Sequence, residues 1–254
     1  MIILNNITCS YDKHSPVFTE LSLELRDHLI FIFGSNGVGK TSLFKCIMGR
    51  LPVSSGSISI NGIPLHKMSE RELSKMIALV PQECTSATEY SVIDFISFGR
   101  TPYLNVFERP SKEDYNLVYK YMVENNIEHL KNKKMNELSG GERQLVYITR
   151  AMVQETPIIV MDEPMSALDY DNQAIILQLI KRLAEQNKYV ILSSHNPNHA
   201  LALSANVIMI DKERKFHYGN AWELLSDNEM LLKTFGKNVK FEGESRSGNV
   251  IFMV

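Results

Sequence analysis

The sequence predicts an α/β fold, and two observations lead to this prediction. Short runs of apolar and β-branched residues alternate with longer segments of helical periodicity, which is the pattern of a sheet flanked by helices. Residues 91–137 interrupt this alternation with a mainly helical pattern. We therefore expect one domain over residues 1–235 with a helical insert at roughly 83–140. Residues 236–254 form an extension whose apolar end, Val250–Val254, has the character of a strand.

The first third of the chain is rich in expected strands. Apolar runs predict strands over residues 1–8, 17–25, 28–33 and 76–81, and helical periodicity predicts a helix over residues 40–49. Polar and apolar residues alternate over residues 57–60, and Asn61-Gly62 follows them. Because this dipeptide favours tight turns, we expect a β-hairpin there.

The rest of the chain contains the insert and then returns to the α/β pattern. Ser91 and Ser111 are suited to cap helices of the insert. Lys131, Lys133 and Lys134 form a basic cluster, which we interpret as a solvated linker. Helices are predicted over residues 141–154 and 171–187, and strands over residues 157–161, 189–193 and 206–210.

Composition and charge exclude several classes of protein. The chain has 254 residues, with 27 Lys and Arg against 29 Asp and Glu, so its formal net charge of −2 argues against a nucleic-acid partner. The three cysteines, Cys9, Cys46 and Cys84, form no CxxC pair, which is typical of free thiols in a reducing compartment. No apolar run approaches the ~20 residues of a membrane span, and the N-terminus lacks a secretory pattern. We expect a soluble chain that reaches a membrane only through a partner.

A glycine-rich segment after the third expected strand predicts a phosphate-binding loop. It fits the pattern G-x-x-x-x-G-K-[ST] and precedes a helix, whose positive dipole end favours an anion. Lys40 is expected to reach the β- and γ-phosphates, and the Thr41 hydroxyl to bind Mg²⁺. A tight turn without a ligand is the alternative interpretation. The expected nucleotide-contacting residues here are Gly34, Ser35, Asn36, Gly37, Val38, Gly39, Lys40, Thr41 and the adjoining Ser42.

An acidic pair follows the apolar strand expected at residues 157–161. Asp162 would emerge at the carboxyl edge of the sheet, where α/β folds bind ligands, and Glu163 follows it directly. We expect Asp162 to bind Mg²⁺ and Glu163 to orient and polarise the attacking water. The alternative is a strand end that faces solvent without a role in chemistry.

Further segments resemble the motifs of ATP-binding cassette (ABC) proteins. Residues 138–144, Leu-Ser-Gly-Gly-Glu-Arg-Gln, resemble the family's signature motif, and Gln82 resembles the glutamine of its Q-loop. Asp169, in Ser-Ala-Leu-Asp, resembles the D-loop aspartate, and His195 resembles the switch histidine. Tyr11 resembles the aromatic residue that stacks on adenine. The motifs occur in the family's order, and the resemblance covers residues 2–235.

This resemblance implies a P-loop NTPase with an ABC-type core, in which a RecA-like sheet and an antiparallel β subdomain are joined by an inserted helical subdomain. It also implies a head-to-tail homodimer that binds ATP and Mg²⁺ between its subunits. Lys40, Asp162 and Glu163 of one subunit would act with Ser139 and Gly141 of the other. Gln82 would bind the metal or water, and His195 would sense the γ-phosphate. Gly140, Glu142 and Asp169 complete the expected nucleotide-contacting set.

Some of these residues allow a second interpretation. Ser139 would cap a helix in any protein, Gln82 could be a polar strand end, and Tyr11 could belong to the core. His195 and His199 have the i, i+4 spacing of a zinc pair, but Pro197 suits the first turn of a helix and would leave His195 outside it. Met165 replaces the threonine usual in the family before the D-loop, and its flexible thioether is expected to pack there.

The segment from Ser97 to Tyr103 bears on the cargo. It resembles a segment of the ATPases that energise uptake of iron chelates, haem and cobalamin, although Gly99 and Pro102 could simply end a helix. The resemblance implies a motor on the cytoplasmic face of the inner membrane, bound to permease subunits and served indirectly by a substrate-binding protein. The alternatives are an importer ATPase for an oxyanion such as molybdate, a cytosolic ABC ATPase without a permease, and a nucleotide-dependent switch without turnover.

Overall fold

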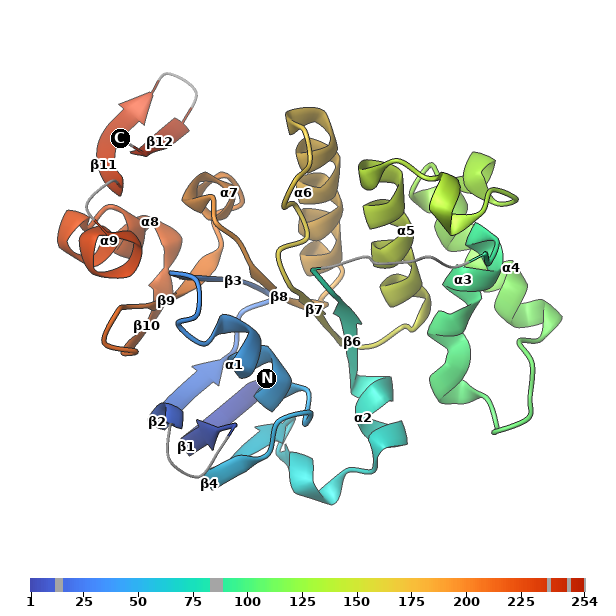
Figure 1. The fold of residues 1–254 in the computed structure, drawn as a ribbon, viewed down its shortest axis with the longest axis horizontal. Coiled ribbons are helices and arrows are strands. Elements are labelled where there is room, and N and C mark those ends of the chain that lie inside the picture. The colour runs from blue at the N-terminus through green and yellow to red at the C-terminus, as the bar shows by residue number, and fades with distance from the viewer. Residues whose placement is uncertain (12–15, 83–88, 237–238, 246–247, 254) are drawn as a thin grey trace. The chain divides into compact units, whose positions relative to one another are not determined.

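The chain forms two compact units, one of residues 1–69 and 189–254 and one of residues 70–188. We call them the discontinuous unit and the central unit (Figure 1). The structure is a computed structural model that describes residues 1–11, 16–82, 89–236, 239–245 and 248–253. Within these residues no helix is both long enough and apolar enough to span a membrane.

The discontinuous unit begins with an antiparallel sheet of strand order β2-β1-β4-β5. Ile2 and Leu4 of β1 alternate into the core, and after a shift in register Ile7 is buried as well. Ile60 pairs with Ile63 across a turn in which Asn61 and Gly62 have φ values of 50° and 81°. The hairpin predicted from Asn-Gly is thereby confirmed. The strands are β1 (Ile2–Ser10), β2 (Pro16–Leu25), β4 (Val53–Ile60) and β5 (Ile63–Pro64).

The second set of strands in this unit has the order β10-β9-β3-β8. β3 is parallel to both β8 and β9 and is buried on both faces, as expected for a central strand that reads Leu-Ile-Phe-Ile-Phe. β10 closes the edge in antiparallel orientation. The carboxyl ends of β3 and β8 meet at one edge, and α1 (Lys40–Ile47) begins there. The strands are β3 (Leu29–Gly34), β8 (Tyr189–Ser193), β9 (Asn206–Ile210) and β10 (Phe216–Asn220).

The C-terminal part of the discontinuous unit contains elements that the sequence analysis did not predict. Asn220 and Asp227 cap α8 and α9 with their side chains, and β10 precedes them. The two-stranded hairpin of β11 and β12 agrees with the strand character expected near the end, although Val254 lies outside the described residues. These elements are α7 (Pro197–Ala202), α8 (Ala221–Leu225), α9 (Asn228–Phe235), β11 (Val239–Ser245) and β12 (Gly248–Met253).

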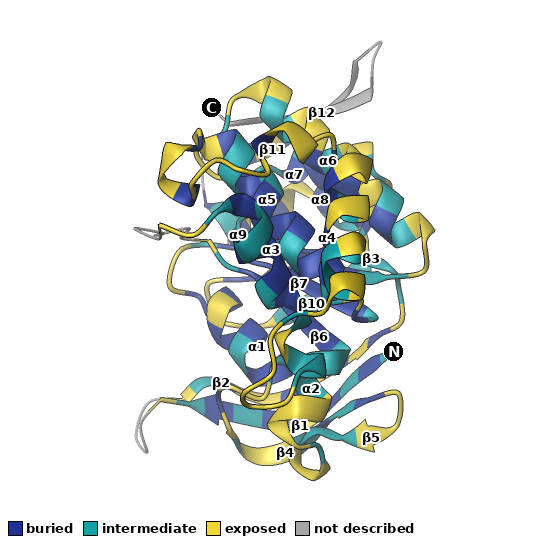
Figure 2. Ribbon diagram, turned by 90° about the vertical axis from the view of Figure 1, so that its right-hand side faces the viewer, coloured by how far each residue is buried: buried dark blue, intermediate teal, exposed yellow. Residues whose placement is uncertain are grey.

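The central unit combines two parallel strands with a group of helices. β6 (Ile77–Val80) and β7 (Ile158–Met161) pair in register, and α2 (Glu70–Met76) leads into β6. The longer helices are amphipathic: α4 (Lys112–Glu124) buries Val118 and Met122 and exposes its outer face (Figure 2). The remaining helices are α3 (Val92–Ser97), α5 (Gly140–Val153) and α6 (Tyr170–Glu185), with short 3₁₀ turns η2 (Phe98–Tyr103), η3 (Glu128–Leu130) and η4 (Met135–Glu137).

The helical insert has the caps that the sequence predicts. The Ser91 and Ser111 side chains accept hydrogen bonds from the backbone of Asp94 and Asp114, at distances of 3.3 and 3.2 Å, and so cap α3 and α4. α3 ends at Ser97, two residues before Gly99, and the 3₁₀ turn η2 then contains both Gly99 and Pro102 and ends at Tyr103. Gly99 is also required by packing, since a Cβ there would lie 2.4 Å from the carbonyl oxygen of Arg150. The start of the expected insert, with Cys84, lies outside the described residues.

Candidate functional site

The phosphate-binding loop occupies the turn between β3 and α1 in the discontinuous unit. Gly37 and Gly39 have φ values of 77° and 120°, which L side chains rarely adopt. Lys40 is only 6% exposed, and its Nζ donates to the carbonyl oxygens of Gly34 at 2.8 Å and Ser35 at 3.4 Å. The ammonium group therefore lies over the loop at the positive end of α1, where an anion is favoured.

Tyr11 lies beside this helix and not in the core. The residue is 59% exposed, which excludes the core interpretation. The hydroxyl accepts hydrogen bonds from Ser42 Oγ at 3.2 Å and from Lys45 Nζ at 3.3 Å. The Lys45 ammonium also lies 5.3 Å from the ring centroid. The helix that begins with Lys40 therefore fixes an exposed aromatic face near the loop.

His195 is exposed and lies between β8 and α7, as Pro197 predicts. Asn196 caps α7, and its backbone N–H donates to Ser194 Oγ at 3.1 Å. His199 is buried within the helix, and burial lowers its pKa. Because His195 is not on the helix, the two histidines do not form the zinc pair of a helix face. The described residues contain no group of three or more His, Cys, Asp or Glu side chains that could hold a metal ion.

The central unit brings Gln82 and the acidic pair together. The Asp162 backbone N–H donates to Val80 O at 2.9 Å. β6 and β7 are therefore paired up to their carboxyl ends, just before Gln82 and Glu163. Gln82 Nε2 donates to Glu163 Oε2 at 2.8 Å. Asp162 is buried, and Glu163 has a φ of 47°, a conformation that non-glycine residues adopt at an energetic cost. Met165 is buried, as expected for a packed thioether.

The start of α5 carries the segment that resembles the signature motif. Ser139 and Glu142 form a reciprocal capping box: Ser139 Oγ accepts from the Glu142 backbone at 3.3 Å, and Glu142 Oε2 accepts from the Ser139 backbone at 2.8 Å. This backbone bond lowers the pKa of Glu142, and the Lys133 ammonium, 3.3 Å from Oε1, lowers it further. Lys133 and Lys134 are exposed, as predicted, and both form ion pairs.

Asn172, which the sequence analysis missed, lies against the same helix start. A Cβ at Gly141 would lie 2.4 Å from Asn172 Oδ1, so only glycine leaves room for this side chain. Asp169 caps α6 by accepting from the Asn172 backbone N–H at 2.8 Å. Asn172 therefore connects the D-loop segment with the first turn of α5. Its contact joins positions far apart in sequence, and no local pattern indicates it.

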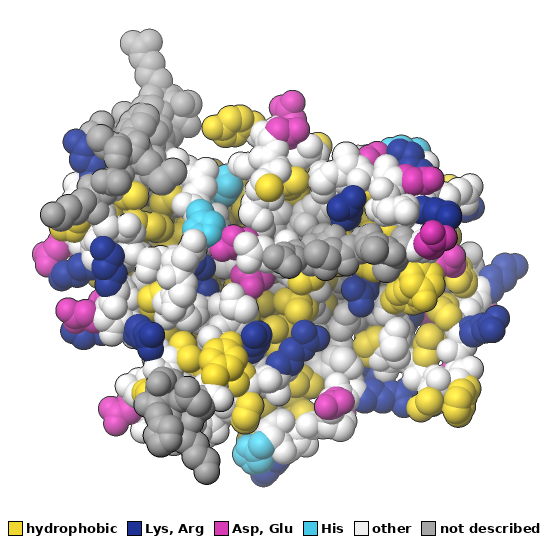
Figure 3. Space-filling model, in the orientation of Figure 1, with side chains coloured by type: hydrophobic (Ala, Val, Ile, Leu, Met, Phe, Trp, Pro, Cys, Tyr) yellow, Lys and Arg dark blue, Asp and Glu magenta, His cyan; other side chains and the backbone are white. Residues whose placement is uncertain are grey.

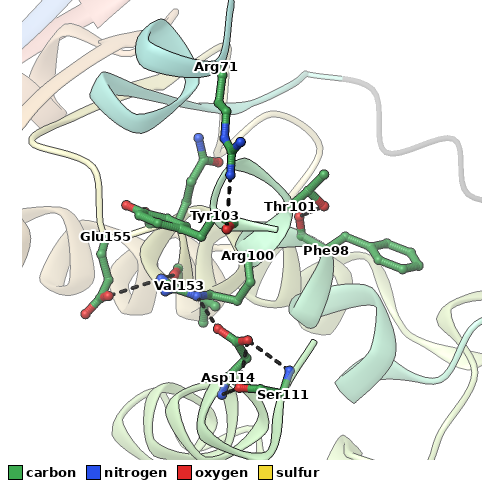
Figure 4. Close-up of polar contacts among 10 residues, drawn as sticks. Arg71, Phe98, Arg100, Thr101, Tyr103, Ser111, Asp114, Val153 and Glu155 are labelled. Atoms are coloured by element: carbon green, nitrogen blue, oxygen red, sulfur yellow. Dashed lines mark hydrogen bonds and ion pairs between the residues drawn. The ribbon is translucent and has the colours of Figure 1, made fainter. Parts of the chain in front are cut away.

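The segment from Ser97 to Tyr103 contains Arg100, whose side chain is only 12% exposed and contacts residues outside the segment (Figure 4). Arg100 Nε donates to Asp114 Oδ1 at 2.8 Å, and its NH1 donates to Val153 O at 3.0 Å and Glu155 Oε2 at 3.1 Å. The guanidinium carbon lies 4.1 Å from the Tyr103 ring centroid. Arg100 therefore joins η2, the start of α4 and the end of α5, a structural role that the sequence analysis did not predict.

Charged side chains show no large region of one sign on the face drawn in Figure 3. Lys and Arg are interspersed there with Asp and Glu, as a net charge of −2 suggests.

Comparison with known proteins agrees with this geometry. Residues 18–166 match the family model described as ABC transporter. The molybdate import ATP-binding protein of Haemophilus influenzae is 31% identical over 89% of this chain and 85% of its own. A probable iron chelatin transport ATP-binding protein of Helicobacter pylori is 32% identical over 84% of each chain. A solved metal-chelate type ABC transporter in an inward-facing conformation superposes with a TM-score of 0.85, at 28% identity, over 100% of this chain and 96% of its own.

The chain therefore belongs to the ABC transporter family. It is an ATP-binding cassette, and it hydrolyses ATP as members of this family do. The expected fold class, a P-loop NTPase with an ABC-type core and an inserted helical subdomain, is confirmed.

Proposed function

We propose that this chain is the ATP-hydrolysing subunit of an importer that takes up a metal chelate. The observation that carries the catalytic part of this proposal is the 2.8 Å contact between Gln82 and Glu163 where β6 and β7 end. This contact fixes the Glu163 carboxylate directly after the buried Asp162. The backbone of Glu163 has a positive φ, and such strain is typical of functional sites.

The site residues have separate roles in this proposal. The phosphate loop, from Gly34 to Thr41, binds the triphosphate through backbone N–H groups and Lys40, and Tyr11 stacks on adenine. Glu163 polarises the attacking water, and His195 contacts the γ-phosphate. Residues 1–235 form the cassette, with residues 83–140 as the insert.

The donor set fits Mg²⁺, which prefers oxygen ligands. The Thr41 hydroxyl, the Asp162 carboxylate and the Gln82 amide oxygen are the groups that would hold the ion. When bound, Mg²⁺ neutralises charge on the phosphate oxygens and so supports attack at the γ-phosphate.

The signature helix acts on the nucleotide of a second copy of the chain. Its first turn presents backbone N–H groups at a helix N-terminus, the arrangement that binds phosphate oxygens. Ser139, Gly140, Gly141, Glu142 and Asp169 contribute this face of the site. ATP thus joins two cassettes, and hydrolysis releases them, which drives permease subunits at the cytoplasmic face of the membrane.

The cargo assignment is supported by two likenesses. The segment around Arg100 resembles that of chelate importers, and the full chain superposes on a metal-chelate type transporter. The likeness to a molybdate importer favours a second candidate, an oxyanion importer. Neither cargo contacts this chain in the proposal, because the permease and the substrate-binding protein select it.

An uptake experiment separates the candidates. Cells that lack this chain are supplied with the wild-type gene or with Glu163→Gln, and uptake of radiolabelled ferric hydroxamate and molybdate is measured. We expect only iron uptake to require an active Glu163. Loss of molybdate uptake alone would favour the second candidate. Unchanged uptake of both would lead to the same measurement with haem and cobalamin, and unchanged uptake of all four would contradict an importer of either kind and favour an ATPase without a permease.

A further inference from the structure

Two cysteines that the nucleotide chemistry does not use lie in contact in the discontinuous unit. Cys9 is on β1 and Cys46 is on α1, 37 positions apart in sequence. Their sulfur atoms are 3.1 Å apart, and both side chains are buried, with exposed fractions of 0% and 1%. Both are free thiols. A disulfide bond of ~2.04 Å therefore requires the two sulfurs to approach by only about 1 Å.

We propose that Cys9 and Cys46 form a site of reversible oxidation, at which peroxide converts the two thiols into a disulfide. The bond would join the strand that leads to Tyr11 with the helix that begins at Lys40. It would stabilise the nucleotide-binding part of the chain under oxidising conditions. This inference does not depend on the cargo or on the role of Glu163.

The contact assigns a different part to each cysteine. Cys46 donates its S–H to Cys9, and this hydrogen bond favours the charged form of Cys9. Burial raises the pKa of both thiols, and the contact with Cys9 raises that of Cys46 further. Cys9 is thus the better nucleophile, and Cys46 is the thiol that resolves the intermediate. Because burial keeps both thiols largely protonated, the pair stays reduced until an oxidant small enough to reach it is present.

The reaction balances with one molecule of hydrogen peroxide. The Cys9 thiol first releases its proton, and its thiolate attacks one peroxide oxygen. The O–O bond breaks, and the departing hydroxide takes up the released proton to form water. Cys46 sulfur then attacks the sulfur of the Cys9 sulfenic acid. The S–S bond forms, the S–O bond breaks, and the hydroxyl leaves with the Cys46 proton as a second water.

Disulfide mapping of the full-length wild-type chain tests the proposal. The reduced protein is treated with hydrogen peroxide, denatured, alkylated and digested without reductant. We expect mass spectrometry to find the peptides of Cys9 and Cys46 joined and lighter by two hydrogen atoms, with Cys84 as the internal comparison. Complete alkylation of both thiols, separate sulfinic acids on each, or a bond from either to Cys84 would overturn the proposal.

Thermal unfolding supplies a second readout that does not depend on catalysis. A bond that closes this loop should raise the Tm of the treated protein by on the order of 5 °C, and reductant should reverse the rise. Cys9→Ala and Cys46→Ala, each compared with and without peroxide, should show no rise. A reversible rise of the same size in either variant would contradict the assignment. If both variants fail to fold, the wild-type mapping decides alone. Absence of ATP turnover in the untreated, reduced wild-type chain would contradict the proposed function and would leave the disulfide outcome unaffected.

Discussion

Single residues of the same type have different roles in this chain, and their contacts distinguish them. Glu142 uses its carboxylate to cap its own helix, whereas Glu163 receives the Gln82 amide at 2.8 Å at the end of a buried strand. Glu142 follows the capping-box pattern, so its role is local. Of these two glutamates, Glu163 is the one held at a strand end beside a buried acid, as its proposed action on water requires.

The first prediction concerns this residue. Glu163→Gln keeps the shape of the side chain and removes the base, so ATP turnover should fall by about 100-fold or more while ATP binding is retained. Phosphate release and calorimetric titration measure the two properties. The exposed Glu185→Gln is the control and should change neither. Turnover at the wild-type rate in Glu163→Gln would remove Glu163 from its role.

The second prediction concerns the two glycines of the signature helix. A Cβ at Gly141 would lie 2.4 Å from Asn172 Oδ1, whereas a Cβ at Gly140 meets only Leu168 Cδ2 at 3.8 Å. Gly141→Ala should therefore lower the free energy of unfolding by about 1–3 kcal/mol, as overpacking does. Gly140→Ala should be neutral or stabilising by up to about 1 kcal/mol.

Denaturant unfolding measures both variants of this second prediction. The double variant Gly141→Ala with Asn172→Ala removes the clash and should regain most of the stability relative to Gly141→Ala. Equal effects of alanine at positions 140 and 141 would show that Asn172 does not determine the need for glycine at position 141.

At the scale of elements, Arg100 determines how the helices of the central unit are joined. Its side chain and that of Asp114 are only 12% and 14% exposed, and the guanidinium contacts η2, α4 and the end of α5. A planar group with several donors suits this position, and a lysine ammonium does not reproduce it. The pair therefore contributes more than an exposed ion pair would.

The third prediction follows from this geometry. Arg100→Lys should lower the free energy of unfolding by about 2–4 kcal/mol, although the charge is kept, because it leaves Asp114 without its partner Nε. The matched control is Arg26→Lys, whose ion pair with Glu24 is exposed, with a side-chain exposure of 69% for Arg26. The control should change stability by less than about 1 kcal/mol. Equal losses in urea unfolding would refute the role given to Arg100.

The fourth prediction is the pH dependence of the same pair. Burial alone would raise the pKa of Asp114, but hydrogen bonds from the Ser111 backbone and from Arg100 hold it below its usual value. A lowered pKa in the folded state contributes stability above the unfolded value of ~3.9, and this stability is lost as pH falls through the lower folded value. The stability difference between wild type and Asp114→Asn should therefore shrink as the pH is lowered from about 5 to about 3. A difference that is constant over this range in urea unfolding would contradict the account.

At the scale of the whole molecule, the sequence predicts the elements and motifs whose pattern is local. The phosphate loop, the acidic pair and the caps at Ser91 and Ser111 require certain residue types at fixed spacing, and the structure has them at the expected elements. Contacts between distant positions have no such pattern. Arg100 with Asp114 and Cys9 with Cys46 are separated by 14 and 37 positions, and only the folded chain brings them together.

Short elements were also missed, for a related reason. α8 has five residues, and β10 has intermediate burial at four of its five positions without an apolar run, so neither has a periodic signal long enough to read. The residues that cap α8 and α9, Asn220 and Asp227, are visible in the sequence. A search for helix caps followed by short apolar pairs would have indicated both helices.

The central claim is that ATP binds between two copies of this chain, and the mass of the protein in solution tests it most directly. Light scattering is measured on Glu163→Gln with and without Mg²⁺-ATP, and on the same variant carrying Lys40→Ala. We predict that Glu163→Gln changes from the monomer mass of 29.0 kDa to about twice that value only when ATP is present, and that the added Lys40→Ala abolishes the change. A monomer that persists at saturating ATP, or a dimer that forms regardless of ATP, would contradict the account.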